Sequence, residues 1–250
     1  MENQDGLDKL FFELASESRL GILFELQKKN LKMQEVAQKL SLTHTEVFRQ
    51  LQRLSEALLI QKMLDGSYSI TQNGKLLLRF ADGFEFVLRF KKMLLTRDVE
   101  RIPYQFIHRL GELSKADLST DSIEMVNSAE QLITGAEKYL WIIGERPLSF
   151  LGAKAAEKVK KGLSIKILFD ESCRKFYENL PEAKGVIEKK VIPRIPAILI
   201  INENCAGINL LSVDERADNA IFFGRDPPLV KWANDLFVYF WEQGKRLYPT

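Results

Sequence analysis

The sequence predicts an α+β protein built from more than one domain. Residues 33–71 read as two short amphipathic helices, a tight turn and a hairpin, whereas residues 76–95 form one apolar helical stretch. After residue 119 strand-like and helical segments alternate. These patterns predict an N-terminal domain over 1–75, a helical linker over 76–118 and an α/β domain over 119–250.

Two helices separated by a short turn are predicted in the first domain. Their apolar residues recur at helical spacing: Met33, Val36, Ala37 and Leu40 in the first, and Val47, Leu51, Leu54 and Leu58 in the second. Thr43, followed by Glu46 three residues later, has the spacing of a capping box and places the start of the second helix. This is the helix-turn-helix layout, whose second helix enters the DNA major groove.

The opposite face of the second helix is polar and basic. The residues expected to contact DNA there are His44, Thr45, Phe48, Arg49, Gln52 and Arg53. An arginine can bond two guanine acceptors, and an aromatic ring can contact a thymine methyl group. Phe48 has an equally favoured alternative, in which its ring packs against the hairpin or a neighbouring helix.

A hairpin is predicted directly after this helix. Residues 59–63 and 67–70 are strand-like and flank Asp65-Gly66, a strong hairpin signal. A hairpin in this position is a wing. Lys62, Ser67 and Tyr68 are expected to reach phosphates or the minor groove from it.

Segments 14–23, 36–42, 47–60 and 68–75 resemble the ArsR and TrmB type of winged-helix regulators. The resemblance covers the first third of the chain and implies a winged helix-turn-helix that binds double-stranded DNA. Metal sensing of the ArsR kind is not expected, because no cysteine precedes Cys173.

Charge and composition fit a cytoplasmic protein. The net charge is only +2, but residues 46–97 carry nine Lys and Arg against five Asp and Glu, a modest footprint for phosphate contacts. Two cysteines do not make a disulfide framework and indicate a reducing cytosol. No signal peptide opens the chain, and the apolar run 192–201 is broken by two prolines, so no membrane partner is expected.

The predicted linker contains two helical stretches. The first, over 76–95, is apolar on more than one side and has Gly83 as a possible break point. It either forms a dimer contact or packs on the second domain. The second stretch, over 101–113, has Pro103 in its first turn, and the polar residues 114–121 mark the boundary.

The last region alternates between strand and helix, which favours an α/β sheet. Strands are predicted over 123–126, 139–143, 163–169, 187–192, 197–201, 205–211 and 220–224. Helices are predicted over 127–138, 149–161, 172–180 and 226–245. Asn127 with Glu130 provides the capping signature for the first of these helices.

Segments 128–133, 139–143 and 158–168 resemble a phospholipase-D-like half-domain, which serves as the effector module of TrmB-type regulators. With 101–113 and 231–237, the chain resembles archaeal winged-helix transcriptional regulators of the methanogenesis-regulator type. The resemblance implies a regulator, expected to be a homodimer, whose C-terminal domain either senses a small-molecule effector or mediates dimerisation.

Catalysis is not expected. The phospholipase D reaction needs a histidine followed by lysine and aspartate, whereas this chain has only His44 and His108, both outside the predicted α/β domain. Neither histidine has a lysine two positions on, and no motif for a metal or cofactor is present in the sequence.

A ligand crevice is predicted at the carboxyl ends of the strands, where α/β sheets bind ligands. Arg146, Asp170 and Ser172 are the residues expected to line it, although the same positions also read as ordinary loop. Trp141 and Trp232 are expected in the core. Cys173 and Cys205 are expected to be packed, with a redox role as the alternative.

Together these observations predict a DNA-binding transcriptional regulator without catalytic activity. The alternative is a protein-interaction adaptor that uses the winged helix without binding DNA, since the apolar Phe48 can also dock a protein.

Overall fold

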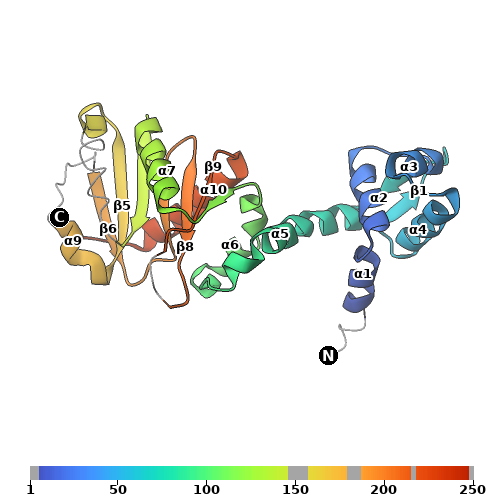
Figure 1. Ribbon diagram of the computed structural model, residues 1–250, viewed down its shortest axis with the longest axis horizontal. Helices are drawn as coiled ribbons and strands as arrows, with labels where there is room; N and C mark the ends of the chain where they lie inside the picture. The colour runs from blue at the N-terminus through green and yellow to red at the C-terminus, as the bar shows by residue number, and fades with distance from the viewer. Residues whose placement is uncertain (1–5, 146–156, 179–186, 215–217, 248–250) are drawn as a thin grey trace. The chain divides into compact units, whose positions relative to one another are not determined.

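A computed structural model describes residues 6–145, 157–178, 187–214 and 218–247. The chain divides into two compact units, Met1–Asp82 and Gly83–Thr250 (Figure 1). Helix α5 (Gln72–Leu94) contributes its first half to unit 1 and its second half to unit 2. Within the described ranges, no helix is both long and apolar enough to cross a bilayer.

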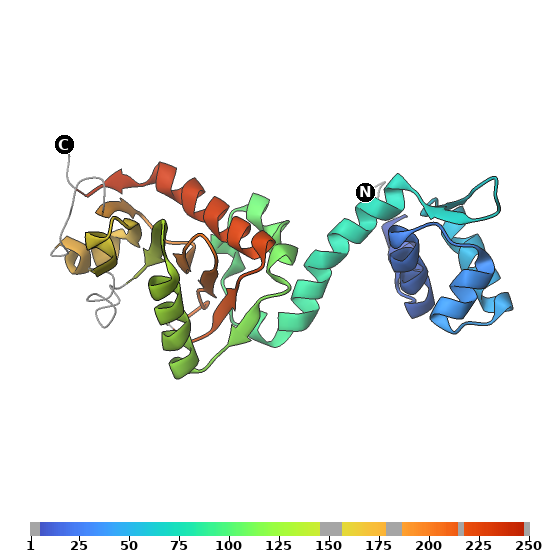
Figure 2. The same cartoon turned by 90° about the horizontal axis from the view of Figure 1, so that it is seen from above.

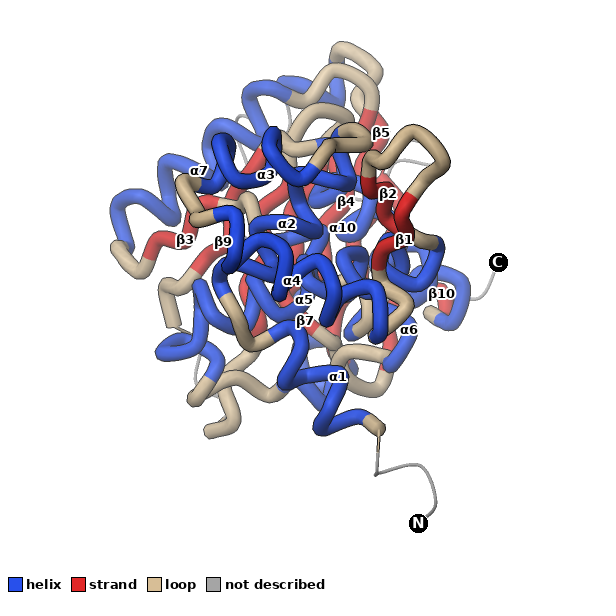
Figure 3. Tube along the Cα trace, turned by 90° about the vertical axis from the view of Figure 1, so that its right-hand side faces the viewer, coloured by secondary structure: helices blue, strands red, loops and turns tan. Residues whose placement is uncertain are grey.

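Unit 1 contains four helices and a hairpin ahead of α5, and they can be followed in Figure 3. The elements are α1 (Leu7–Leu14), α2 (Glu17–Lys28), α3 (Met33–Leu40), α4 (His44–Glu56), β1 (Ile60–Lys62) and β2 (Tyr68–Ile70). Segment 14–23, one of the segments that resemble winged-helix regulators, is interrupted between α1 and α2. Ser16 causes the interruption by capping α2, its hydroxyl accepting from the Arg19 amide at 3.4 Å.

The predicted helix-turn-helix is present, and α4 starts after Thr43 as predicted. Ser41 ends α3 in the left-handed region at φ 54°, and the Thr43 hydroxyl caps α4 by accepting from the Glu46 amide at 3.2 Å. Only this half of the capping box forms, because the Glu46 carboxylate instead accepts from the Ser18 hydroxyl at 3.0 Å. The prediction that Leu58 is buried was wrong: it lies past the end of α4 at φ 58° and is 65% exposed.

The wing has a three-residue loop over 64–66, between the two strand-like runs that the sequence predicted. The Met63 amide donates to the Ser67 carbonyl at 2.7 Å, and the Gly66 amide donates to the Met63 carbonyl at 3.0 Å. Gly66 has φ +82°, which the last residue of such a loop requires and which glycine adopts without strain. Tyr68 extends the pairing by exchanging backbone hydrogen bonds with Leu31 at 2.8 and 3.1 Å.

Helix α5 is continuous through Gly83, so the predicted break there was wrong. A glycine inside a helix costs only about 1 kcal/mol relative to alanine, too little to end a long helix. The predicted linker 76–118 is not a separate region either. From Phe86 onward it packs into the core of unit 2, which includes Phe90, Ile102 and Phe106.

The helix predicted over 101–113 is three short turns instead. They are η1 (Val99–Arg101), α6 (Tyr104–Ile107) and η2 (Leu110–Leu113). Pro103 provides the reason, because a proline biases the preceding residue toward extended backbone, and Ile102 has ψ 122°.

Unit 2 is built on one mixed sheet of eight strands in the order β10-β6-β5-β4-β7-β8-β9-β3. Strands β4 (Tyr139–Gly144), β5 (Ser164–Asp170) and β6 (Ile187–Ile192) run parallel, whereas β7 (Ala197–Ile201) is antiparallel to β4. The remaining strands are β3 (Asp117–Ser119), β8 (Ala206–Leu210), β9 (Ile221–Gly224) and β10 (Lys245–Arg246). Six predicted strands therefore match observed ones to within two residues at each end.

Helices α7 (Ser122–Gly135) and α10 (Pro227–Gln243) cover opposite faces of this sheet (Figure 2). Successive residues of β7 show the two-sided burial, since Leu199 and Ile201 pack with α10 while Ile200 packs with α7. Two apolar layers therefore enclose the sheet, as expected for strands that are hydrophobic on both faces.

The strand predicted over 123–126 was wrong, because these residues form the first turns of α7. Asp121 caps the helix, its carboxylate accepting from the amides of Ile123 at 2.7 Å and Glu124 at 3.1 Å. Asn127 and Glu130 therefore lie inside the helix. Within the helix predicted over 172–180, the structure describes η4 (Glu171–Cys173) and α9 (Arg174–Glu178), and residues 179–180 lie outside the described ranges. Most of the helix predicted over 149–161 also lies outside the described residues.

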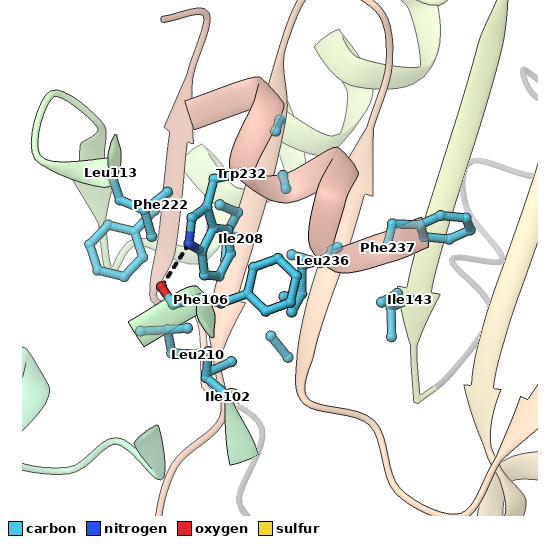
Figure 4. Close-up of a cluster of buried hydrophobic side chains, with 14 of the residues drawn as sticks. Ile102, Phe106, Leu113, Ile143, Ile208, Leu210, Phe222, Trp232, Leu236 and Phe237 are labelled. Carbon is cyan, nitrogen blue, oxygen red and sulfur yellow. Dashed lines mark hydrogen bonds between the residues drawn. The ribbon is translucent and has the colours of Figure 1, made fainter. Parts of the chain in front are cut away.

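Trp232 joins the segment after α5 to the final helix. Its ring is fully buried, and its indole nitrogen donates to the Phe106 carbonyl at 3.1 Å (Figure 4). The two rings meet edge to face with centroids 5.9 Å apart. This buried contact confirms the predicted core role of Trp232 and fixes residues 99–113 on unit 2.

Gly74 provides a test of the packing around the wing. A Cβ there would lie 2.4 Å from the Leu59 carbonyl oxygen and 2.7 Å from the Cγ1 of Ile70. Gly74→Ala is expected to lower the free energy of unfolding by about 1–3 kcal/mol through overpacking. In the same helix, a Cβ added at Gly83 would have nothing within 4 Å. Gly83→Ala is therefore expected to raise the free energy of unfolding by about 0.5–1 kcal/mol. Urea unfolding followed by circular dichroism measures both, and equal effects would contradict the prediction.

Candidate functional site

The exposed face of α4 brings together five of the nine residues predicted to contact DNA. His44, Thr45, Phe48, Arg49 and Gln52 are all exposed. At about 100° per residue they span an arc of roughly 140° around the helix, away from its buried side. Phe48 is 55% exposed, so much of its ring is open to solvent. The face is therefore polar with one projecting aromatic ring.

Arg53 is directed elsewhere, contrary to its predicted role at a groove. Its guanidinium pairs with the Glu13 carboxylate of α1, through Nε to Oε2 at 3.1 Å and Nη2 to Oε1 at 2.5 Å. The same guanidinium lies 5.1 Å from the centre of the Phe12 ring. The Arg53 hydrogen bond holds the pKa of Glu13 below its ordinary value, against the opposing effect of partial burial. Arg53 thus fastens α4 to α1.

Arg19 completes this connection from α2 and is 5% exposed. Its guanidinium donates to the carbonyls of Glu13 and Phe12, both at 2.6 Å, and to the side-chain oxygen of Gln50 at 3.0 Å. Residues of α1, α2 and α4 therefore meet at one buried cation. The sequence analysis missed Glu13 and Arg19, because the contacts are long-range and have no local spacing signal.

The wing offers fewer phosphate contacts than predicted. Lys62 is exposed, but Ser67 is 5% exposed because its hydroxyl and amide both donate to Asp65 Oδ1, at 2.6 and 2.9 Å. These bonds lower the pKa of Asp65. Tyr68 is half-buried against the unit 1 core. The side chain that projects furthest is Leu64 at the turn, which is fully exposed and was not among the predicted contacts.

Unit 1 has no excess of positive charge over its whole length. Residues 1–82 contain eleven Lys and Arg and eleven Asp and Glu. Generic attraction to a polyanion is therefore weak, and recognition of DNA by this unit would depend on local contacts.

A second candidate site lies at the carboxyl ends of β4, β5 and β6. A cavity of about 530 Å³ opens there. It is lined by Arg101, Glu145, Asp170, Ser172, Cys173, Phe176, Pro193, Arg194 and Ile195. The predicted residues Asp170 and Ser172 do meet in it, Asp170 Oδ1 accepting from the Ser172 amide at 2.9 Å. Arg146 lies outside the described residues.

The remaining chemistry-bearing residues of unit 2 are packed. Trp141 stacks on Phe237 at 4.9 Å, as its predicted core role requires. Cys205 is buried, which raises the pKa of its thiol, and Cys173 is half-buried. Both cysteines are free thiols. Among the described residues, no group of His, Cys, Asp and Glu is arranged to hold a metal ion.

No known family model matches the chain, and no curated protein matches it. One similar solved structure is TrmBL2, an archaeal chromatin protein with a novel mode of DNA binding, at 11% identity over 87% of this chain and 88% of its own, with a TM-score of 0.43. NucT from Helicobacter pylori is 10% identical over 53% of this chain and 98% of its own, with a TM-score of 0.41.

Nuc from Salmonella typhimurium, a phospholipase D family member, is 15% identical over 54% of this chain and 97% of its own, with a TM-score of 0.40. All three TM-scores lie below 0.5, so these similarities establish neither a shared fold nor a function. The function is inferred from the chain's own residues.

The pairing of Glu13 with Arg53 predicts a pH-dependent stability of unit 1. A carboxyl group whose pKa is lowered on folding stabilises the fold above its ordinary value of 4.5, and this contribution is lost as the pH falls. Glu13→Gln is expected to melt below the wild type at pH 7, with the difference shrinking between about pH 5 and pH 3.

The melting is followed by circular dichroism rather than by tryptophan fluorescence. All three tryptophans lie in unit 2, so their fluorescence does not report on unit 1. Glu17→Gln, which removes the same charge from an exposed position of α2, is the control. A difference for Glu13→Gln that stays constant from pH 7 to pH 3 would contradict the prediction.

Proposed function

We propose that this chain is a DNA-binding transcriptional regulator located in the cytoplasm. The observation that supports this best is the exposed face of α4, a capped helix that follows a three-residue turn and is followed by a hairpin. Such a helix presents its N-terminal residues to base edges in the major groove.

Each exposed residue of α4 has a plausible partner on DNA. Arg49 can donate to both acceptors of a guanine, and the Phe48 ring can contact a thymine methyl group. Thr45 and Gln52 can bond base edges, while Lys62 of the wing can reach a phosphate. Because unit 1 has balanced charge, these contacts rather than bulk charge are expected to determine affinity.

Homodimerisation through α5 is part of the proposal. Leu76, Phe80 and Val87 are about half-exposed and fall within an arc of roughly 40° on the helix. A continuous apolar stripe on a soluble helix favours burial against a second copy. A dimer would read two half-sites about 34 Å apart.

Unit 2 is proposed to sense a small molecule rather than to catalyse a reaction. Its cavity at the strand ends is the candidate effector site, and neither histidine of the chain lines it. An effector would act by binding more tightly to one of two dimer arrangements that space the recognition helices differently.

A protein-interaction adaptor is the alternative, and the apolar side chains of unit 1 favour it. Phe48, Met63 and Leu64 are all exposed on α4 and the wing, in a unit without excess positive charge. Exposed apolar groups of this kind also suit a protein partner. DNA binding by the full chain distinguishes the two roles.

Arg49→Ala is expected to weaken binding to a duplex selected from a random pool by about 5-fold to 150-fold. Loss of one bidentate arginine contact to guanine costs about 1–3 kcal/mol. The measurement is a titration of the full chain with labelled duplex at two salt concentrations, since phosphate and base contacts differ in their salt dependence.

The control for this experiment is Lys29→Ala, which removes an equal charge from an exposed position outside α4. Equal losses in the two variants would mean that charge alone is responsible. Selection of no duplex at all would favour the adaptor.

Phe80→Gln combined with Val87→Gln is expected to convert the dimer to a monomer of 28.8 kDa, because two apolar groups of the α5 stripe are replaced by polar ones. Light scattering measures the mass. Arg79→Gln, an exposed substitution on the same helix, should leave the dimer intact. A wild-type chain that is already monomeric would contradict this part of the proposal.

A further inference from the structure

We propose that the tip of the wing is an apolar wedge for DNA. In this proposal the Leu64 side chain enters the minor groove of a duplex, partly unstacks one base step and bends the duplex. The inference rests on the proposed function and deepens it, because it assigns a specific role in DNA binding to the loop over 64–66. The exposed face of α4 is not involved, so the two proposals depend on different residues.

Leu64 occupies a position that the turn itself leaves open. It is the first residue of the three-residue loop, and its side chain is fully exposed. Such a loop is typically built on a type I turn, whose first central position accepts most residues. The loop projects from unit 1 beyond the two strands of the hairpin (Figure 2). Neither the turn nor the core of unit 1 therefore requires a leucine at this position.

Hydrogen bonds hold the loop in one conformation. Asp65 Oδ1 accepts from the Ser67 hydroxyl at 2.6 Å and from the Ser67 amide at 2.9 Å. The Met63 amide donates to the Ser67 carbonyl at 2.7 Å, and the Gly66 amide donates to the Met63 carbonyl at 3.0 Å. Opening a base step costs free energy. A loop fixed by four hydrogen bonds can hold its leading side chain in place while the step opens, so the wedge is preorganised.

The charges around the tip suit a groove lined by phosphates. Lys62 is exposed on β1, two residues before Leu64. The pKa of Asp65 is lowered chiefly by its hydrogen bonds from Ser67 and further by the charge of Lys32, so this carboxylate is ionised next to a cation. Two cations and one anion thus surround the leucine, and the excess cation is available to a phosphate.

The size of the apolar tip decides between DNA and a protein as its partner. A stable protein interface buries about 800 Å² on each partner. In the range 61–67, only Met63 and Leu64 are exposed apolar residues, and their neighbours Gln61, Lys62 and Asp65 are exposed and polar. Two side chains supply a small part of that area, whereas a single apolar side chain is enough to open a base step. The minor groove is only about 6 Å wide, which also suits a narrow loop tip.

The test uses the full chain and the duplex that the wild type selects from a random pool. Dyes at the two ends of the duplex report its bend through energy transfer, and 2-aminopurine at successive positions reports unstacking as a rise in fluorescence. Both signals are read at saturating protein, so that differences in affinity do not affect them. For the wild type we expect a bend of roughly 20–90° and raised fluorescence at one step in each half-site.

Leu64→Ser is expected to reduce the bend by at least half and to abolish the rise in 2-aminopurine fluorescence, whereas Leu64→Met should retain both. Leu58→Ser is the matched control, because Leu58 is also an exposed leucine but lies before β1, at the end of the hairpin away from the loop. This control should bend the duplex as the wild type does. Both serine variants should melt close to the wild type, since both side chains are exposed.

The proposal is overturned if the bound duplex stays straight or if Leu64→Ser bends it as the wild type does. It is also overturned if Leu58→Ser straightens the duplex to the same extent, because the effect would then not belong to the tip. A wild type that selects no duplex would contradict both this proposal and DNA binding by the chain. A duplex that is bound but straight would contradict the wedge alone.

Discussion

The buried Arg19 guanidinium is the interaction on which the arrangement of unit 1 depends. It sits on α2 and bonds to carbonyls at the end of α1 and to Gln50 of α4, and burial lowers the pKa of this arginine. A buried cation is costly unless each of its donors is satisfied. Any tilt of α4 would break one of these bonds, so the cost of leaving the cation unpaired fixes the recognition helix.

This constraint explains how Arg49 and Arg53 of α4 differ. Arg53, in the last turn, is used inside the protein to bind Glu13, whereas Arg49 one turn earlier stays exposed. The N-terminal half of a recognition helix approaches base edges, and its C-terminal half is free to serve the scaffold. In a unit with balanced charge, one of these two cations thus holds the helix in place and the other stays exposed.

The elements that could be predicted from sequence were those with a local cause. Thr43 and Asp65-Gly66 act through their neighbours, and the apolar spacing of 33–54 needs no distant partner, so the helix-turn-helix and wing were found nearly in place. The strand predicted at 123–126 failed for the opposite reason. The apolar residues of 123–126 fit either a strand or a helix, and the cap formed by Asp121 stabilises the start of a helix there.

The residues of the candidate sites also divide into those with a local sequence signal and those that depend on distant contacts. The α4 face follows from helical spacing alone, and Asp170 with Ser172 follows from the rule that ligands bind at strand ends. Arg101, Glu13 and the true role of Arg53 could not be found, because each depends on contacts between segments far apart in sequence. The linker prediction failed likewise, since only tertiary packing shows that Phe86 and Phe106 share a core.

Arg101 of the cavity and the end of helix α5 lie on one short stretch of chain. Arg101 lines the cavity, and four residues earlier Arg97 follows α5 directly and is buried. Arg97 donates to the Leu210 carbonyl at 3.0 Å and pairs with Asp218, which anchors the end of α5 to the sheet. The wall of the cavity and the anchor of α5 are thus only four residues apart in the chain.

The size of the required effect limits what such a ligand must do. Shifting a two-state equilibrium from 1:99 to 99:1 needs about 10⁴-fold tighter binding to one state, or roughly 5.5 kcal/mol. Charge-assisted hydrogen bonds contribute about 1.5–3 kcal/mol each. Two such bonds made in only one arrangement give about 3–6 kcal/mol, so an effector of this protein would need at least two of them to approach that value.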